Sequence, residues 1–224
     1  MIVANLRRRT IELVFVVLCT AGISSAASGK VDVIGPLTDS SASDALRKML
    51  EPKGYRVLLD DGSVACEIWL RNSVPAGTAK EVEGALFPQL SESTLVGVLS
   101  FPKAATDYRG QPIKPGLYTL RYELLPNDGN HLGAAPSRDI LLLVPAAADP
   151  DPSATFKFAD LVNLSRKASG TKHPAPLSMV QPENDSVPAV SKDDQNHWTF
   201  AGKVKIQPGD PLLFGLVVKG TAQQ

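Results

Sequence analysis

The stretch YTLRYEL at residues 118–124 is the clearest structural signal in the chain, because apolar and polar side chains alternate along it without a break. Tyr118, Leu120, Tyr122 and Leu124 share one parity, and more polar residues occupy the positions between them. Successive side chains of a β-strand point to opposite faces of the sheet, so this alternation predicts a strand. We expect one face of it to lie in a core and the other to face water.

Strand signals continue on both sides of this stretch. Residues 139–144 form an unbroken apolar run after the first residue, which is typical of a strand covered on both faces. The pair Asp61 and Gly62 stands between two extended runs and predicts a β-hairpin. The other predicted strands are residues 56–59, 63–71, 94–101, 198–206 and 212–219.

One short helix and one long irregular segment complete the prediction. The helix runs from Ser41 or Ser43 to Leu50, because a serine cap precedes an apolar stripe. The tripeptide FKF at residues 156–158 has the pattern of a short strand. Residues 166–194 hold four prolines among polar residues, which predicts an irregular excursion with one extended piece near residues 177–180.

The spacing of these elements indicates a fold class. About seven to nine short strands separated by turn signals, with one early helix, predict a mainly β protein. They favour an antiparallel β-sandwich over a doubly wound sheet. We interpret residues 28–224 as a single domain of this kind, in which the segment AAADPDP at 146–152 turns a corner. The alternative, in which that segment separates two lobes, stays open.

Residues 107–120, with the sequence DYRGQPIKPGLYTL, resemble a recurrent piece of secreted immunoglobulin-like and transthyretin-like domains. In those domains a Pro and Gly turn feeds a strand whose Tyr and Leu alternate inward. The resemblance covers roughly a tenth of the chain and implies a β-sandwich fold without implying any activity.

The N-terminus has the three parts of a secretory signal peptide, residues 1–27. Three consecutive arginines precede an apolar stretch at residues 13–22, and the small residues Ser-Ser-Ala-Ala follow it. The apolar stretch is shorter than the roughly 20 residues that a membrane-spanning helix needs. We therefore expect cleavage after Ala26 or Ala27, a secreted or periplasmic protein, and no membrane span after removal of the signal.

Charge and cysteine content exclude some classes of function. Lys and Arg together number 23, as do Asp and Glu, so the chain lacks the basic excess of a general nucleic-acid-binding protein. Beyond the signal peptide only Cys66 remains, so no disulfide can form within one chain. At this length the hydrophobic core is large enough to stabilise the domain alone.

Two groups of residues are candidates for binding a ligand. Trp69 lies between Glu67 and Arg71 on one parity of a predicted strand, an arrangement suited to holding a sugar or a peptide. The opposing interpretation is that the early helix covers Trp69 and makes it part of the core. Tyr108 and Arg109, in the loop before Pro112, form a second candidate recognition point.

No catalytic or metal-binding constellation is recognisable in the sequence. His131, His173 and His197 have no ligand spacing, and we expect His197 at the surface or rim of a strand. The motif Gly-x-Ser-x-Gly is absent, and Cys66 alternates inward, where a thiol is inert. We therefore predict no catalytic residues, no metal ligands and no cofactor.

These observations favour an exported, non-catalytic binding or structural module of the cell envelope. Its partner would be an envelope protein or a glycan, and the sequence does not indicate its oligomeric state. The alternative is an envelope hydrolase or metal-binding protein whose site is assembled from residues distant in sequence. That alternative predicts a concave pocket in which a histidine meets an acid and a hydroxyl or thiol group.

Overall fold

The computed structural model describes residues 29–77, 82–129, 131 and 133–222. The predicted signal peptide, residues 1–27, lies outside this part of the chain. Of the helices in the described part, none is both long and apolar enough to cross a membrane.

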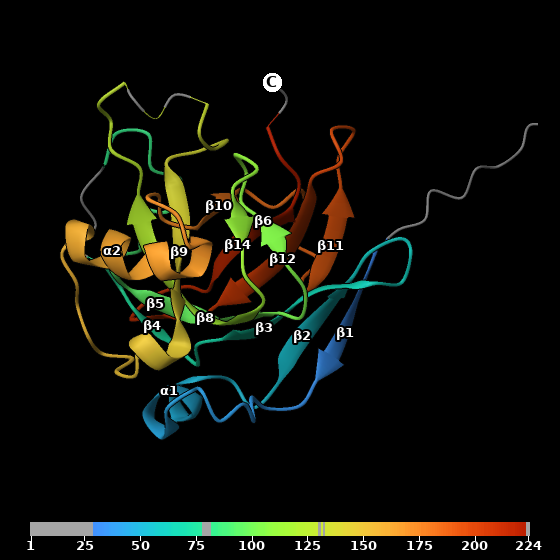
Figure 1. Ribbon diagram of the computed structural model, residues 1–224. Helices are drawn as coiled ribbons and strands as arrows, with labels where there is room; N and C mark the ends of the chain where they lie inside the picture. Colours follow the sequence, from blue (N-terminus) through green and yellow to red (C-terminus); the bar gives the residue numbers. More distant parts are fainter. Residues whose placement is uncertain (1–28, 78–81, 130, 132, 223–224) are drawn as a thin grey trace, which may run out of the picture.

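A sheet of ten strands organises the described chain (Figure 1). Every strand in it pairs antiparallel with its neighbours. The strands, in their order across the sheet, are β1 (Lys30–Ile34), β2 (Gly54–Leu58), β3 (Val64–Leu70), β5 (Leu95–Phe101), β8 (Gly116–Leu124), β9 (Asp139–Pro145), β10 (Pro176–Val180), β14 (Leu212–Lys219), β12 (Trp198–Val204) and β11 (Ala189–Lys192).

Short elements accompany the sheet. Two small ladders pair β13 (Ile206–Gln207) with β4 (Val74–Pro75) and β6 (Ala105–Thr106) with β7 (Pro112–Ile113). The helical elements are α1 (Asp44–Met49), the 3₁₀ turn η1 (Ala146–Ala148) and α2 (Phe158–Ser169). The large sheet contains strands from both sides of residues 146–152, the segment that we interpreted as a corner.

The large sheet curls almost into a barrel and brings its two edge strands, β1 and β11, close together. A Cβ atom on Gly29, next to β1, would lie 2.4 Å from the Trp198 ring and 3.1 Å from the Val190 side chain of β11. At the end of β11, Lys192 Nζ donates to Asp60 Oδ2 in the β2–β3 turn at 3.0 Å. The prediction of a mainly β, antiparallel fold is confirmed. A sandwich is not confirmed, because one curled sheet replaces two facing sheets.

Alternating side chains fill the interior of the curled sheet. On β8, Tyr118, Leu120 and Tyr122 point into this interior as their parity predicts, and Cys66 of β3 is fully buried beside them. Removing apolar surface from water contributes about 25 cal/mol per Å², so this interior is the main source of stability. Other buried members are Val57, Ile68, Leu99, Leu141, Leu143, Met179, Phe200, Phe214 and Leu216.

The outer face of β8 differs from the prediction. We expected water on this face, but Thr119, Arg121 and Glu123 are all buried there. The segment after β9 covers them: Arg121 Nε and Nη2 donate to the two oxygens of Asp149 at 2.8 and 2.7 Å. The Arg121 guanidinium also lies 5.0 Å from the centre of the Phe156 ring. A charged side chain tolerates such burial only when it is paired and hydrogen-bonded, as Arg121 is.

The early helix is confirmed as α1. Ser43 is its N-cap, and the Ser43 hydroxyl oxygen accepts from the backbone N–H of Leu46 at 3.0 Å. Leu46 and Leu50 are buried in a cluster that also contains Trp69. The helix therefore buries its apolar side against the outer face of β3 and β5.

The second helix, α2, overturns two predictions: that residues 156–158 form a strand, and that the early helix is the only one. Residues 156–158 do not form a strand; Phe158 instead begins a helix of 12 residues that lies across β9 (Figure 1). Leu161, Ser165 and Ala168 are three of its four buried positions, and their spacing of four and three residues is helical. Gly170 ends the helix with a positive φ of 69°. A tripeptide such as FKF is too short for its alternation to decide between helix and strand.

The predicted irregular segment, residues 166–194, is irregular only in part. It contains the last turn of α2 and the strands β10 and β11. The extended piece near residues 177–180 is confirmed, because it forms part of β10, which pairs with both β9 and β14. Prolines here lie at strand ends and in loops, which is why they did not prevent pairing.

Candidate functional site

Trp69 lies in the core of the protein. Only 5% of the residue is exposed, and it belongs to the cluster beneath α1 with Leu46 and Leu50. Its indole Nε1–H donates to the carbonyl oxygen of Gly35 at 3.0 Å, so the polar end of the ring is also satisfied. The ring is therefore not available as a platform for a sugar or a peptide, and the alternative interpretation, in which α1 covers it, describes the structure.

Glu67 and Arg71, the charged neighbours of Trp69, do not form a common site. Glu67 Oε1 accepts from Arg56 Nε at 2.7 Å, across the β2–β3 pair. Arg71 Nη1 donates to the carbonyl oxygen of Leu95 at 3.4 Å. Four residues of extended chain separate the two, which is roughly 13 Å at 3.3 Å per residue. Their partners differ, and no described contact brings them together.

The turn at residues 107–111 holds the other predicted pair, Tyr108 and Arg109. Asp107 is fully buried at its centre. Asp107 Oδ1 accepts from the backbone N–H groups of Arg109 and Gln111 at 3.0 and 2.9 Å. Asp107 Oδ2 accepts from Arg109 Nη2 at 3.1 Å and from Gln111 Nε2 at 3.3 Å. One carboxylate thus fixes both the backbone of the turn and two of its side chains.

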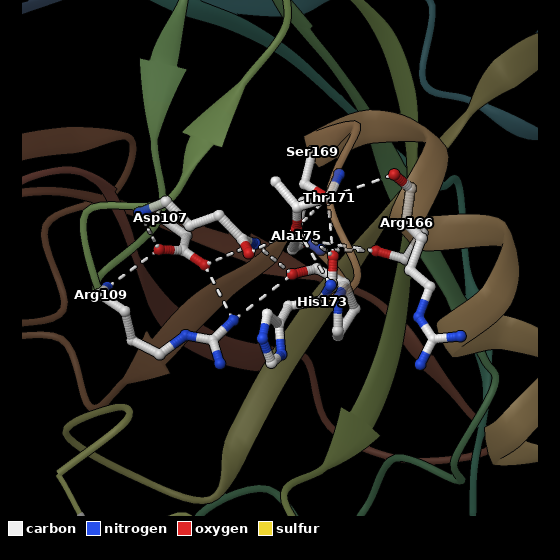
Figure 2. A network of polar contacts seen from close by, with 10 residues as sticks. Asp107, Arg109, Arg166, Ser169, Thr171, His173 and Ala175 are labelled. Atoms are coloured by element: carbon white, nitrogen blue, oxygen red, sulfur yellow. Dashed lines mark hydrogen bonds and ion pairs between the residues drawn. The ribbon is translucent and has the colours of Figure 1, made fainter.

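This turn is joined to the loop that follows α2 (Figure 2). Gln111 Nε2 donates to the carbonyl oxygen of Pro174 at 2.7 Å, and Thr171 Oγ1 donates to Gln111 Oε1 at 2.8 Å. Ser169 Oγ, in the last turn of α2, donates to the carbonyl oxygen of His173 at 2.7 Å. The Arg109 guanidinium, the His173 ring and the Arg166 guanidinium lie on the same side of this network (Figure 2).

A cavity of about 220 Å³ opens beside these three side chains, and we call it the α2 pocket. Its walls combine an apolar floor from β9 and α2 with basic side chains from the turn and the loop. Phe158, a large apolar residue that is 41% exposed, lies at its edge. The lining consists of Arg109, Leu125, His131, Ala134, Ala135, Ile140, Leu142, Phe158, Val162, Arg166, Lys172, His173, Pro174 and Pro176.

The charge on the walls of the α2 pocket is one-sided. Five of its lining residues are basic or histidine, and none is an aspartate or a glutamate. Arg109 is paired with Asp107, and His131 with Asp128. Arg166 binds only the uncharged Asn163, and no ion pair or hydrogen bond joins the Lys172 ammonium group to another described residue. The two cations Arg166 and Lys172 are therefore available to a bound anion.

Tyr108 lines a different cavity, of about 320 Å³, which we call the Tyr108 pocket. The Tyr108 ring lies 5.1 Å from the His197 ring, centre to centre, at an angle of 40°. His197 was expected at the surface or rim, but it is only 6% exposed. The lining consists of Tyr108, Pro136, Val180, Gln181, Pro182, Glu183, Ser191, Asp193, Asp194, Gln195, His197, Thr199, Ala201 and Val217.

His197 meets an acid in this pocket, as the hydrolase alternative requires, but it has no nitrogen free to act as a base. Its Nε2 lies 3.0 Å from the carbonyl oxygen of Thr221, which only accepts, so Nε2 carries a proton. Its Nδ1 lies 2.8 Å from Asp193 Oδ2. Burial alone would lower the pKa of His197, but the bonds to Thr221 and Asp193 together outweigh it and raise that pKa. Both ring nitrogens thus face oxygen acceptors, which favours the protonated imidazole and leaves no nitrogen free to act as a base for Ser191 or Thr199.

The remaining candidates for chemistry are separated from one another. His131 and His173 both line the α2 pocket, but no carboxylate lines it with them. Within the described residues no group of three or more His, Cys, Asp or Glu side chains is placed to hold a metal ion. Cys66 is fully buried, and burial raises the pKa of its thiol well above the ordinary value.

Comparisons of the chain with protein-family models, with curated proteins and with solved structures found no match. The assignment of a function therefore rests on the two pockets. As candidates for ligand binding, the sequence analysis named one residue of each pocket, Tyr108 and Arg109. It missed Phe158, Arg166 and Lys172. The signal that could have found them is the helical spacing of residues 161, 165 and 168 before Gly170, which places Phe158, Val162 and Arg166 on a different side.

Proposed function

We propose that the protein is an exported, non-catalytic binding module and that the α2 pocket takes a small amphipathic anion. The observation that carries this proposal is the composition of the pocket: basic side chains and apolar walls, with no carboxylate among the lining residues. The N-terminal signal-like sequence supports export. Ligand sites are commonly mostly apolar cavities with a few placed polar groups, and the α2 pocket has that character.

The two halves of the pocket suit the two halves of such a ligand. Ile140 and Leu142 of β9 and Val162 of α2 offer an apolar surface to a short hydrocarbon chain or ring. Arg166 and Lys172 offer donors to a carboxylate or a phosphate, and a guanidinium binds either group through two parallel hydrogen bonds. Because the cations are partly exposed, salt will weaken the charged half of this interaction.

The hydrogen-bond network beneath the pocket supports binding by a preformed site. Asp107, Gln111 and Thr171 fix the turn and the loop that supply Arg109, Lys172 and His173. A site whose backbone is already ordered loses less conformational entropy when a ligand binds. In neither pocket does a histidine or carboxylate side chain hydrogen-bond a hydroxyl or thiol group of another described residue, which favours binding over hydrolysis.

The proposal is tested by calorimetric titration of the purified mature protein with three probes that share one hydrocarbon chain: octanoate, octyl phosphate and octanol. We expect the two anions to bind and the uncharged alcohol to bind at least roughly tenfold more weakly, which is about 1.4 kcal/mol. The anion that binds with the higher affinity will identify the preferred head group. Raising the salt concentration will weaken the anions and leave octanol unchanged.

Variants assign the binding to this pocket. Arg166→Gln and Lys172→Gln will each weaken octanoate binding several-fold, on the scale of 1 kcal/mol for a charge-assisted hydrogen bond. Lys167→Gln is the matched control, because Lys167 is exposed on the same helix but does not line the pocket. Octanoate binding that is absent, or that Lys167→Gln weakens as much as Arg166→Gln does, would contradict the proposal.

A further inference from the structure

The Tyr108 pocket, on the other side of the turn at residues 107–111, has the opposite chemistry. Its floor is apolar and comes from the outer face of three neighbouring strands: Val180 of β10, Ala201 of β12 and Val217 of β14. Its rim is polar, and its lining contains neither lysine nor arginine. The one basic group, His197, is already held by Asp193 and Thr221. An anion therefore finds no available cation here.

The rim offers hydrogen-bonding groups that the protein itself does not use. They include hydroxyl and amide groups, which both donate and accept, and carboxylates, which only accept. None of the following side chains makes a hydrogen bond with another part of the described chain: Tyr108, Glu183, Ser191, Asp194, Gln195 and Thr199.

The aromatic ring of the pocket packs against one other ring and stands on a turn that is itself anchored. His197 packs against Tyr108, with ring centres 5.1 Å apart. The backbone N–H of Ala222 donates to the Tyr108 carbonyl oxygen at 2.7 Å, which fixes the turn to the C-terminal segment. The neighbouring residue Asp107 is anchored by four hydrogen bonds from Arg109 and Gln111. The Tyr108 ring therefore lies beside His197 on an anchored turn at the edge of the cavity.

We infer that the Tyr108 pocket is a second binding site and that its ligand is a neutral sugar. A pyranose carries hydroxyl groups that donate and accept, as the rim requires, together with C–H faces that suit an aromatic ring and an apolar floor. A simple cation would use the carboxylates of Glu183 and Asp194 but leave the donors of Ser191, Gln195 and Thr199 unused. The cavity of about 320 Å³ is in the size range of small-ligand sites.

Protein NMR tests this inference on the isotope-labelled mature chain. The probes are maltose, cellobiose and diacetylchitobiose, each titrated to about 20 mM, since a Kd near 1 mM corresponds to only about 4 kcal/mol of binding. We expect at least one disaccharide to shift the amide signals of residues 191–199 and of Tyr108. Putrescine, a small dication without hydroxyl groups, serves as the competing class of ligand.

Variants separate this site from the α2 pocket. Tyr108→Ala will weaken disaccharide binding roughly tenfold, whereas Tyr108→Phe, which keeps the ring, will weaken it less. Thr199→Val removes a hydroxyl group of the rim while keeping the shape of the side chain, and will also weaken binding. Arg166→Gln, in the other pocket, will leave it unchanged. The inference is overturned if no disaccharide shifts these signals, if the shifts map to another surface, or if only putrescine binds.

Discussion

At the scale of single residues, Arg121 and Glu123 occupy neighbouring positions on the outer face of β8, and both are buried. They differ in whether the side chain has hydrogen-bond partners. Every polar nitrogen of Arg121 has a partner: Asp149 and the carbonyl oxygens of Ser93, Asp151 and Ala154. Neither carboxyl oxygen of Glu123 has a hydrogen-bond partner in the described chain, although the residue is buried. A buried carboxyl group without partners is expected to keep its proton.

The Glu123 carboxyl group therefore makes stability depend on pH. Burial, with a smaller effect of the Glu92 charge, outweighs the lowering effect of the nearby Ser93 backbone N–H and raises the Glu123 pKa from 4.5 to about 8. Between these values the unfolded chain releases this proton while the folded chain retains it, so the free energy of unfolding falls as pH rises. We expect a loss on the order of a few kcal/mol from pH 5 to pH 8, measured by urea denaturation at several pH values.

Two variants isolate this contribution. Glu123→Gln cannot ionise, so it will flatten the pH dependence and stabilise the protein at high pH. Glu92→Gln is the control, because Glu92 is exposed and only adds to the repulsion; it will leave most of the dependence in place. A wild-type free energy of unfolding that stays constant over this pH range would refute the assignment.

Single residues also show what alternation reveals and what it conceals. The parity of residues 118–124 correctly separated Tyr118 and Leu120 from Arg121 and Glu123. It did not reveal that both parities are buried, because the groups that cover Arg121 on the second face follow 28 to 33 residues later in the chain. For Trp69 the same pattern was compatible with a surface position and with a core position. The structure places Trp69 in the core, because α1 covers it.

At the scale of elements, most strands of the large sheet were predictable, but its two edge strands, β1 and β11, and the helix α2 were not. Strands β3, β5, β9, β12 and β14 lie where their patterns placed them. The first residue of α2, Phe158, is also the last residue of the strand-like tripeptide at 156–158. The rest of the helix is largely polar and has only a narrow stripe of buried residues. Because α2 supplies Phe158, Val162 and Arg166, this single error also concealed the α2 pocket.

The C-terminal end of α2 gives a prediction at this scale. Gly170 has a φ of 69°, where an L side chain is strained. A Cβ there would also meet the mobile end of the Lys114 side chain. Gly170→Ala should lower the free energy of unfolding by about 1 kcal/mol and weaken octanoate binding, because Lys172 and His173 directly follow. Thermal unfolding and calorimetry measure the two effects.

A glycine elsewhere provides the control for this change. Gly62, in the β2–β3 turn, has a φ of 76° with open space around it. Gly62→Ala should cost a similar free energy of unfolding and leave octanoate binding unaltered. If Gly170→Ala is as stable as the wild type, or if both variants weaken octanoate equally, the end of α2 does not position the pocket.

At the scale of the whole molecule, the sequence indicated antiparallel strands but did not distinguish a sandwich from a nearly closed sheet. Period-two alternation buries one face of each strand in either architecture. The difference lies in pairings between distant segments: β10 joins β9 to β14, and so connects the two halves of the chain in one sheet. The outer face of the resulting sheet carries both pockets, with α2 over one and the β10–β12 surface beneath the other.

The near closure of the sheet can be tested at its seam, where β1 approaches β11. A side chain on Gly29 would lie 2.4 Å from the Trp198 ring and 2.7 Å from the Leu58 carbonyl oxygen, so the edges must move apart to admit it. Gly29→Val should therefore destabilise the protein by roughly 1 to 3 kcal/mol, as overpacking does.

Gly35→Val, beyond the other end of β1, is the control, because its added Cβ meets nothing within 4 Å. Hydrogen exchange should quicken at β1 and β11 in the first variant only. Equal exchange in both would mean that the two edges do not support each other, and that the curled sheet is held by its interior alone.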